Sequence, residues 1–133
     1  MKVLVDTSVW SLVLRRNKSA DQLLQAVLTE LIKDFRVEVI GPVRQEILSG
    51  IKDADQFTLL KERLQAFPDL FLTTGDYELA AEYFNTCRNN GIQGSNTDFL
   101  ICAAAVRNNL QILTTDKDFK LYQKHIPIVL FQT

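Results

Sequence analysis

The stretch NTDFLICAAAVRNNLQILTTDKDF, from Asn96 to Phe119, contains the pattern that decides the predicted fold. It predicts a helix that carries Asp98 in its first turn, followed by a short buried strand over residues 111–114. Asp116 and Asp118 come where that strand ends. Acidic side chains therefore stand at the ends of two consecutive elements, where they can converge.

The N-terminus shows the same order of features. The apolar run of residues 2–5 predicts a buried strand that stops at Asp6, and the Thr-Ser pair that follows favours a helix start. In an open parallel sheet, ligands bind in the crevice outside the carboxyl ends of the strands. We therefore expect Asp6 to meet Asp98 and Asp116 at one edge of a sheet.

Strands and helices alternate along the rest of the chain. Apolar residues at helical spacing predict helices, and short apolar or alternating runs that end at Gly or Pro predict strands. The expected helices cover residues 7–14, 19–32, 42–51, 53–67 and 77–89, and the expected strands cover 36–40, 70–72 and 126–131. Pro127 places the last strand at an edge, because proline cannot donate to a sheet. The alternation indicates an α/β fold in a single domain over 1–133, with a mainly parallel sheet of about five strands and helices on both faces.

The composition restricts the function classes. Of the 133 residues, 47% are apolar and 23% are charged, which is ordinary for a soluble globular protein. The formal net charge of -1 gives the whole chain no basic excess for nonspecific binding of nucleic acid. The N-terminus has the pattern of neither a signal peptide nor a membrane span, so we expect a cytoplasmic location and no membrane partner.

The cysteines and the single histidine give no indication of a zinc site. Cys87 and Cys102 form no CxxC pair, His125 is the only histidine, and a structural zinc site takes about four nitrogen or sulfur ligands. We expect both cysteines to be small buried side chains, with a disulfide between them as the alternative. We expect His125 on the surface, because no acid or nucleophile lies near it in sequence to form a triad.

Acids gathered at one edge of a sheet repel one another unless cations lie between them. Oxygen ligands without histidine or thiolate favour Mg²⁺ and Mn²⁺. Such an ion lowers the pKa of a bound water and stabilises the attacking and leaving oxygens of a phosphodiester. The residue types therefore indicate metal-assisted phosphoryl chemistry.

Each acid also has a structural interpretation on its own. Asp6 could cap the helix that follows it, and the helix dipole favours Asp98 in a first turn. Asp116 and Asp118 suit a turn after a strand. Glu46, which borders the packed face of its predicted helix, could be an ordinary solvated side chain.

The sequence resembles a PIN domain, and specifically the VapC-type toxin ribonucleases of bacterial toxin–antitoxin pairs. Four matching segments occur in the family's order from end to end: VLVDTSVW with Asp6, PVRQEILSG with Glu46, TDFLICAAA with Asp98 and LTTDKDF with Asp116. The resemblance implies a three-layer α/β/α PIN-like fold. It also implies a metal-dependent endoribonuclease that cleaves single-stranded or loop regions of RNA.

The resemblance further assigns roles to individual positions. Asp6, Glu46, Asp98 and Asp116 would be the catalytic quartet that holds Mg²⁺ or Mn²⁺. Asp6 and Asp98 would be the core metal ligands, Asp116 would complete the site, and Glu46 would orient or activate the water. The residues that would support them by hydrogen bonds are Thr7, Ser8, Thr115 and Asp118; many relatives carry Asn where this sequence has Ser8.

Three partners follow from the same resemblance: the RNA substrate, a small VapB-like antitoxin bound across the site, and a second copy of the chain in a homodimer. The basic residues that are candidates for contacts with RNA phosphates are Arg15, Arg16, Lys18, Arg44, Arg107 and Lys117. Two other functions fit the same residues. One is a housekeeping RNA-processing nuclease of the PIN fold, and the other is a non-catalytic PIN-fold module whose acids bind basic segments of a partner protein.

Overall fold

Three parallel strands form the centre of the structure, a computed structural model that describes residues 1–14 and 22–132. Strand β1 (Val3–Val5) lies between β2 (Val37–Glu38) and β3 (Gln111–Leu113), and both pairs are parallel. In the β1–β3 pair, Val5 stands opposite Leu113. This arrangement confirms the α/β class with a parallel sheet.

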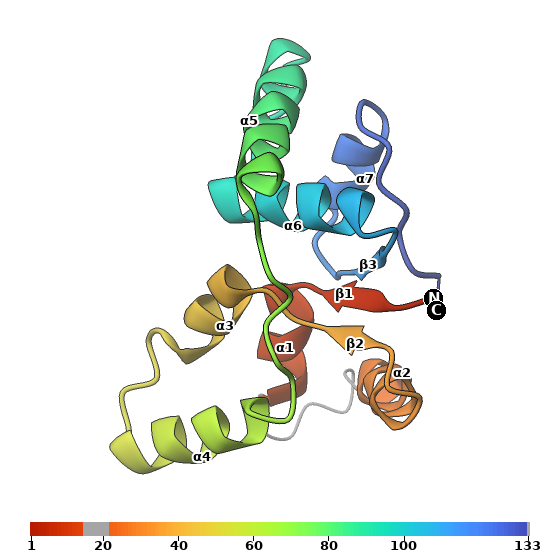
Figure 1. The fold of residues 1–133 in the computed structure, drawn as a ribbon. Helices are drawn as coiled ribbons and strands as arrows, with labels where there is room; N and C mark the ends of the chain where they lie inside the picture. Colours follow the sequence, from red (N-terminus) through yellow and green to blue (C-terminus); the bar gives the residue numbers. More distant parts are fainter. Residues whose placement is uncertain (15–21, 133) are drawn as a thin grey trace.

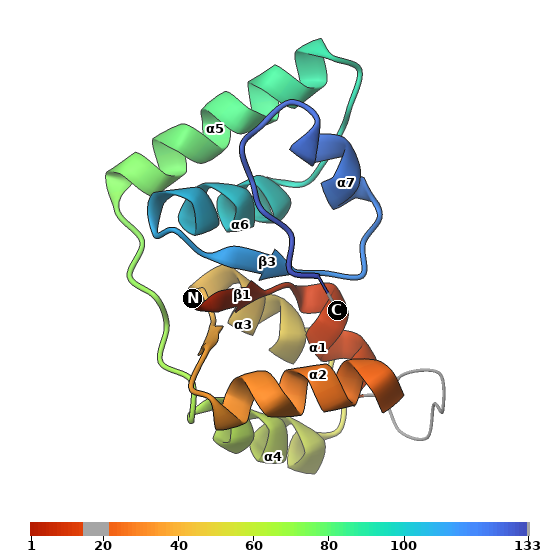
Figure 2. The ribbon, with the colours of Figure 1, turned by 90° about the vertical axis from the view of Figure 1, so that its right-hand side faces the viewer.

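Seven helices surround the sheet in the described part of the chain. They are α1 (Thr7–Leu14), α2 (Gln22–Lys33), α3 (Gly41–Leu48), α4 (Ala54–Leu64), α5 (Thr74–Asn89), α6 (Asn96–Arg107) and α7 (Asp118–Gln123). In Figures 1 and 2, α5, α6 and α7 lie on the β3 side of the sheet, whereas α1 to α4 lie on the β2 side.

The central strand is covered on both faces. Side chains of a strand point alternately to opposite faces, and Val3, Leu4 and Val5 of β1 are all 0% exposed. A strand that is buried on both faces reads as a continuous apolar run, which is the pattern that predicted β1. The sheet is thus the middle layer between helices.

The two outer strands that we predicted are reduced to single bridges. Asp69 pairs with Val39 beyond β2, and Leu130 pairs with Ile112 beyond β3, both in parallel. The predicted strand over 70–72 is wrong because the chain leaves the sheet at once to begin α5 at Thr74. The five predicted strands are therefore three strands and two edge bridges in the described residues.

Pro127 explains why the C-terminal segment forms only a single bridge. The predicted strand over 126–131 begins at a tight turn, in which the Ile128 amide donates to the Ile126 carbonyl at 2.9 Å. Pro127 has no amide proton to donate. Pairing with Ile112 starts only at Val129, so the edge position is confirmed but the strand is not.

Two helix boundaries differ from the predicted ones, and a capping box explains the first. Helix α5 begins three residues earlier than predicted, because Thr73 and Asp76 form a capping box. Helix α4 ends at Leu64 rather than at residue 67. The short helix α7 had no counterpart in the sequence interpretation.

Arg44 ties α3 to the end of α4. Its guanidinium Nε donates to Asp69 Oδ1 at 2.9 Å, Nη1 donates to the Leu64 carbonyl at 2.9 Å, and Nη2 donates to the Phe67 carbonyl. The structure therefore gives Arg44 a packing role, and its contact with an RNA phosphate stays a prediction.

Arg107 joins the end of α6 to the start of α5. Its Nε donates to Asp76 Oδ1 at 2.9 Å, and Asp76 is only 3% exposed. Gly75 makes room for this contact, because a Cβ there would lie 2.7 Å from Arg107 Nη2. Arg107 is thus the partner of a buried carboxylate, and its contact with an RNA phosphate stays a prediction.

Both cysteines are free and buried, as predicted. No helix in residues 1–14 and 22–132 is long and apolar enough to cross a membrane. His125 lies on the surface, which confirms its predicted position.

We predict that Arg107→Ala lowers the free energy of unfolding by about 2 kcal/mol, because a buried carboxylate loses its charged hydrogen-bond donor. Urea denaturation measures the change. Lys33→Ala is the matched control, since the Lys33–Glu30 pair is exposed on both sides and should change stability by less than about 0.5 kcal/mol. Equal losses in the two variants would contradict the role of Arg107.

Candidate active site

Asp6 is buried at the carboxyl end of β1 and is held there by two hydroxyl groups. The side chain is 5% exposed, and its Oδ2 accepts hydrogen bonds from Ser8 Oγ at 2.7 Å and from Thr114 Oγ1 at 2.8 Å. The Asp6 carbonyl accepts from the Val9 amide and so begins α1. The carboxylate itself bonds hydroxyls rather than helix amides among the described residues, so capping is not its main contact.

Thr114 is the residue of this site that the sequence interpretation missed. Val5 pairs with Leu113 in the parallel ladder, so Asp6 and Thr114 are the next residues on neighbouring strands. Thr114 Oγ1 also accepts a hydrogen bond from the Asp116 amide at 3.0 Å. The register of the two predicted strands would have indicated this contact, because residues that follow paired positions lie side by side.

The predicted polar residues Ser8 and Thr115 take part in the same network. Ser8 Oγ lies 3.3 Å from Thr114 Oγ1 and accepts a hydrogen bond from the Thr115 amide at 3.1 Å. Ser8 thus contacts an acid through its side chain, whereas Thr115 contributes its backbone. Together these bonds join the start of α1 to the loop after β3.

Asp98 lies in the first turn of α6, where a capping box and a phenol fix its side chain. The Asp98 amide donates to Ser95 Oγ at 3.1 Å, and Asp98 Oδ2 accepts from the Ser95 amide at 3.4 Å. The same oxygen accepts from the Tyr122 hydroxyl at 2.9 Å. The structural interpretation of Asp98 as a first-turn residue is therefore correct, and its second oxygen accepts no hydrogen bond from the described residues.

Tyr122 is a second residue that the sequence interpretation missed. It is 0% exposed and packs against Phe99 and Phe119, with ring centroids 4.8 Å and 5.2 Å away. Gly94 is required beside it, because a Cβ there would lie 2.8 Å from Phe99 Cε2 and would overlap the phenol. Burial raises the pKa of the Tyr122 phenol, so the hydroxyl keeps its proton and donates a hydrogen bond to Asp98.

Asp116 and Asp118 follow β3 and form the start of α7. The Asp118 amide donates to Asp116 Oδ1 at 2.9 Å, which is the turn contact expected of an aspartate after a strand. Asp116 is half-buried and Asp118 is exposed. The negative charges of Asp118 and Asp116 both raise the pKa of the Tyr122 phenol, so the two acids lie close to the Asp98 side of the site.

Glu46 reaches the start of α1 from α3. Thr7 Oγ1 donates to Glu46 Oε1 at 2.7 Å, although the two residues are 39 positions apart. Both residues line a pocket of about 550 Å³ together with Thr97, the neighbour of Asp98. Glu46 is thus exposed but bonded to Thr7, and it shares a pocket with Thr7 and Thr97, the sequence neighbours of Asp6 and Asp98.

The pKa of Asp98 shows that the carboxylates share one environment. Burial raises it, the hydrogen bonds from Tyr122 and Ser95 lower it, and the negative charges of Asp6 and Asp116 raise it again. The pKa of Cys102, one turn after Asp98, is raised mainly by burial and also by the charges of Asp98 and Asp6. Acids that are far apart in sequence therefore act on one another across the carboxyl edge of the sheet.

The donor set has the chemistry of a site for a hard divalent ion. Each of the four carboxylates uses one oxygen in the bonds above, and the other accepts no hydrogen bond from the described residues. However, no three His, Cys, Asp or Glu side chains in residues 1–14 and 22–132 are arranged as a ligand set. The four carboxylates therefore fit Mg²⁺ or Mn²⁺ by type, whereas their side chains as they stand are not arranged around one ion.

Among the predicted basic residues, Lys117 alone stands beside the acids within the described part of the chain. It is exposed and lies between Asp116 and Asp118. Arg44 and Arg107 make the internal contacts described above. Arg15, Arg16 and Lys18 lie outside the described residues.

Comparison with known proteins agrees with this arrangement. The PIN domain family model matches residues 3–124. Ribonuclease VapC11 of Mycobacterium tuberculosis is 31% identical over 120 residues, which cover 88% of each chain. The structure of VapBC2 from Rickettsia felis, bound to a DNA fragment from its promoter, has a TM-score of 0.79 at 18% identity and covers 98% of each chain. VapBC-5, a toxin–antitoxin system member from Mycobacterium tuberculosis, has a TM-score of 0.70 at 18% identity over the full length of both chains.

A parallel sheet with acids gathered at its carboxyl edge, matched over almost the whole chain by one family model, defines a PIN domain. The chain belongs to the PIN-domain family, and its curated relatives are VapC ribonucleases. The resemblance inferred from the four sequence segments is thereby confirmed.

We predict that Asp98→Asn raises the melting temperature in EDTA at neutral pH. The pKa of Asp98 is raised in the folded protein, so the charge on this carboxyl lowers the free energy of unfolding. This loss of stability is absent below the pKa of the unfolded state and complete above the pKa of the folded state. Asparagine keeps the acceptor oxygen for Ser95 and Tyr122 and has no charge. Thermal melts from about pH 3 to about pH 7 should show the gain growing as the pH rises; a gain that is equal at all pH values would contradict this explanation.

Proposed function

We propose that this protein is a metal-dependent endoribonuclease toxin of a toxin–antitoxin pair. The observation that supports the proposal most is the buried Asp6, which two hydroxyls hold at the sheet edge and which forms no salt bridge with the described residues. Asp98 and Asp116 are close enough to act on each other's charge. A chain keeps such a costly cluster when a cation binds to it.

The side chains would divide the work as follows. Asp6, Asp98 and Asp116 would hold Mg²⁺ or Mn²⁺, which when bound would make a water more acidic and offset the negative charge of the phosphodiester. Ser8 and Thr114 orient Asp6, and Tyr122 and Ser95 orient Asp98, so that each has one oxygen left for binding. Glu46, oriented by Thr7, accepts the proton of the attacking water. Hydrolysis adds the hydroxyl of water to phosphorus and returns a proton to the leaving oxygen of the ribose.

The partners come from the relatives. Ribonuclease VapC11 is named for its activity, and VapBC-5 for its toxin–antitoxin system. For this chain we propose RNA as the substrate, a small VapB-like antitoxin as the protein partner, a homodimer as the assembly and the cytoplasm as the location. Lys117 is the described residue that we propose for a phosphate contact.

One observation favours the non-catalytic alternative. The acids in the described residues are not arranged as a set of metal ligands. A protein-binding module that holds no metal would show the same arrangement. Titration of the purified chain with Mn²⁺ by calorimetry distinguishes the two functions. Saturable binding that disappears in Asp6→Ala supports the nuclease, and no binding favours the module. A small antitoxin reading frame immediately upstream would distinguish a toxin from a housekeeping nuclease.

We predict that Asp6→Asn abolishes growth arrest on induced expression and lowers RNA cleavage by more than about a hundredfold, since even the outer partners of metal ligands are worth about 10–100-fold. A fluorogenic single-stranded RNA with Mn²⁺ or Mg²⁺ measures the rate. Asp53→Asn is the control, because Asp53 is an exposed aspartate that caps α4 and asparagine caps as well. Unchanged growth arrest in Asp6→Asn would refute the proposal.

We predict that Tyr122→Phe weakens Mn²⁺ binding by about tenfold, because the hydrogen bond that orients Asp98 is lost while the ring packing remains. Calorimetry measures the dissociation constant, and a thermal melt checks the fold. Tyr83→Phe makes the same chemical change at another buried tyrosine, away from the acids, and should leave the binding unchanged. An equal effect of the two substitutions would show that Tyr122 does not position Asp98.

A further inference from the structure

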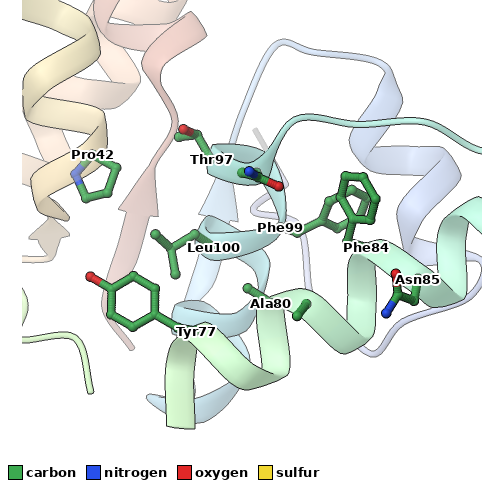
Figure 3. Close-up of a pocket in the computed structure, with 10 residues that line it drawn as sticks. Pro42, Tyr77, Ala80, Phe84, Asn85, Thr97, Phe99 and Leu100 are labelled. Atoms are coloured by element: carbon green, nitrogen blue, oxygen red, sulfur yellow. The ribbon is translucent and has the colours of Figure 1, made fainter. Parts of the chain in front are cut away.

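A second cavity lies between α5 and α6, the helix that also carries Asp98. It has a volume of about 440 Å³. Helix α5 lines it with Tyr77, Ala80 and Phe84, and helix α6 lines it with Phe99 and Leu100 (Figure 3). We call this cavity the α5–α6 groove.

The α5–α6 groove is apolar but has neutral hydrogen-bonding groups at exposed positions. Asn85, Asn96 and Thr97 line it together with the aromatic and aliphatic side chains, and none of its lining residues is charged. The side chains of Asn96 and Thr97 have no hydrogen-bond partner among the described residues. Flat apolar surfaces next to free amide and hydroxyl groups suit a nucleobase, which proteins bind by stacking and by hydrogen bonds to its edges. A phosphate would find no positive charge here.

The groove is continuous with the candidate active site. Pro42 and Thr97 line both the α5–α6 groove and the pocket that contains Thr7 and Glu46. Thr97 is also the residue before Asp98, and Figure 3 shows it next to Pro42. An RNA chain with a phosphodiester at the acids can therefore place a neighbouring base in the groove.

Tyr77 is the side chain best placed to stack on such a base. It stands in the first turn of α5 and is 54% exposed, although it is a large aromatic side chain. A protein side chain in the groove would cover the ring as well. It would also cover the amide of Asn96 and the hydroxyl of Thr97, which costs free energy unless the partner supplies matching polar groups. A base carries such groups on its edge.

Resting on the ribonuclease activity proposed above, we propose that the α5–α6 groove binds the base next to the scissile phosphodiester. Tyr77 supplies the stacking surface, and Asn96 and Thr97 contact the polar edge of the base. The groove then selects which nucleotide stands beside the cleaved bond.

The first test uses uncharged nucleosides, which require neither cleavage nor a metal. Adenosine, guanosine, cytidine and uridine are titrated into the full chain while NMR follows the side-chain amides of Asn85 and Asn96. At least one nucleoside should give saturable shifts, and Tyr77→Ser should abolish them. Phe71→Ser is the matched control, because Phe71 is an aromatic side chain that is 82% exposed and does not line the groove. No saturable shift with any nucleoside overturns the proposal.

The second test measures cleavage of single-stranded RNA. Tyr77→Ser should raise KM by about tenfold with a smaller change in kcat, since stacking on one aromatic side chain contributes to binding on this scale. Tyr77→Phe should restore the wild-type KM, Phe71→Ser should leave it unchanged, and thermal melts check that all variants fold. A wild-type KM in Tyr77→Ser overturns the proposal.

The outcomes separate this inference from the proposed function. RNA cleavage that does not respond to Tyr77→Ser refutes the base site and leaves the nuclease standing. If the chain binds nucleosides in the groove but cleaves no RNA, the proposed nuclease function is refuted and the groove is supported as a base site. Light scattering provides the last check: a dimer that dissociates in Tyr77→Ser would show that a second copy of the chain covers the groove, which overturns the proposal.

Discussion

The position of the Asp6 carboxylate depends on the parallel register between β1 and β3. Val5 opposite Leu113 makes Asp6 and Thr114 neighbours, and the Thr114 hydroxyl then bonds both the Asp6 side chain and the Asp116 amide. A shift of one residue would turn these side chains to the other face of the sheet. All three residues of β1 are fully buried, so such a shift would also disrupt the close packing of the core, and the core and the site depend on the same register.

The charge on Asp98 lowers the stability of the fold, and the rest of the structure compensates for this loss. Asp98 is partly buried near two other carboxylates, and only neutral donors stabilise its charge. Elsewhere the chain pairs its buried acid with a base, as Asp76 with Arg107 shows. The contrast between Asp98 and Asp76 is consistent with the metal-binding role that we propose for Asp98, because a carboxylate that binds a metal ion has to be free of a permanent side-chain cation.

The sequence predicted the parts of this structure that depend on local pattern. The strand before Asp6, the helix of Asp98 and the strand before Asp116 follow from periodicity and from the residues at their ends. Thr114 and Tyr122 did not follow, because their roles depend on contacts with residues about 108 and 24 positions away. The hydrogen bonds of Arg44 and Arg107 did not follow for the same reason: nothing in their local sequence shows the carbonyls and carboxylate to which they donate.

The charge distribution explains why an apolar groove beside the acids matters for recognition. Proteins that bind nucleic acid through phosphates use many basic residues, and their affinity then falls steeply with salt. In the described part of this chain Lys117 is the basic candidate beside the acids, and the net charge of the whole sequence is -1. The attraction between one lysine and RNA phosphates is weak. The carboxylates of the site repel the same phosphates unless a cation is bound. Stacking and neutral hydrogen bonds do not suffer this repulsion, and for this reason we propose the groove lined by Tyr77, Asn96 and Thr97, rather than basic residues, as the place where a base binds.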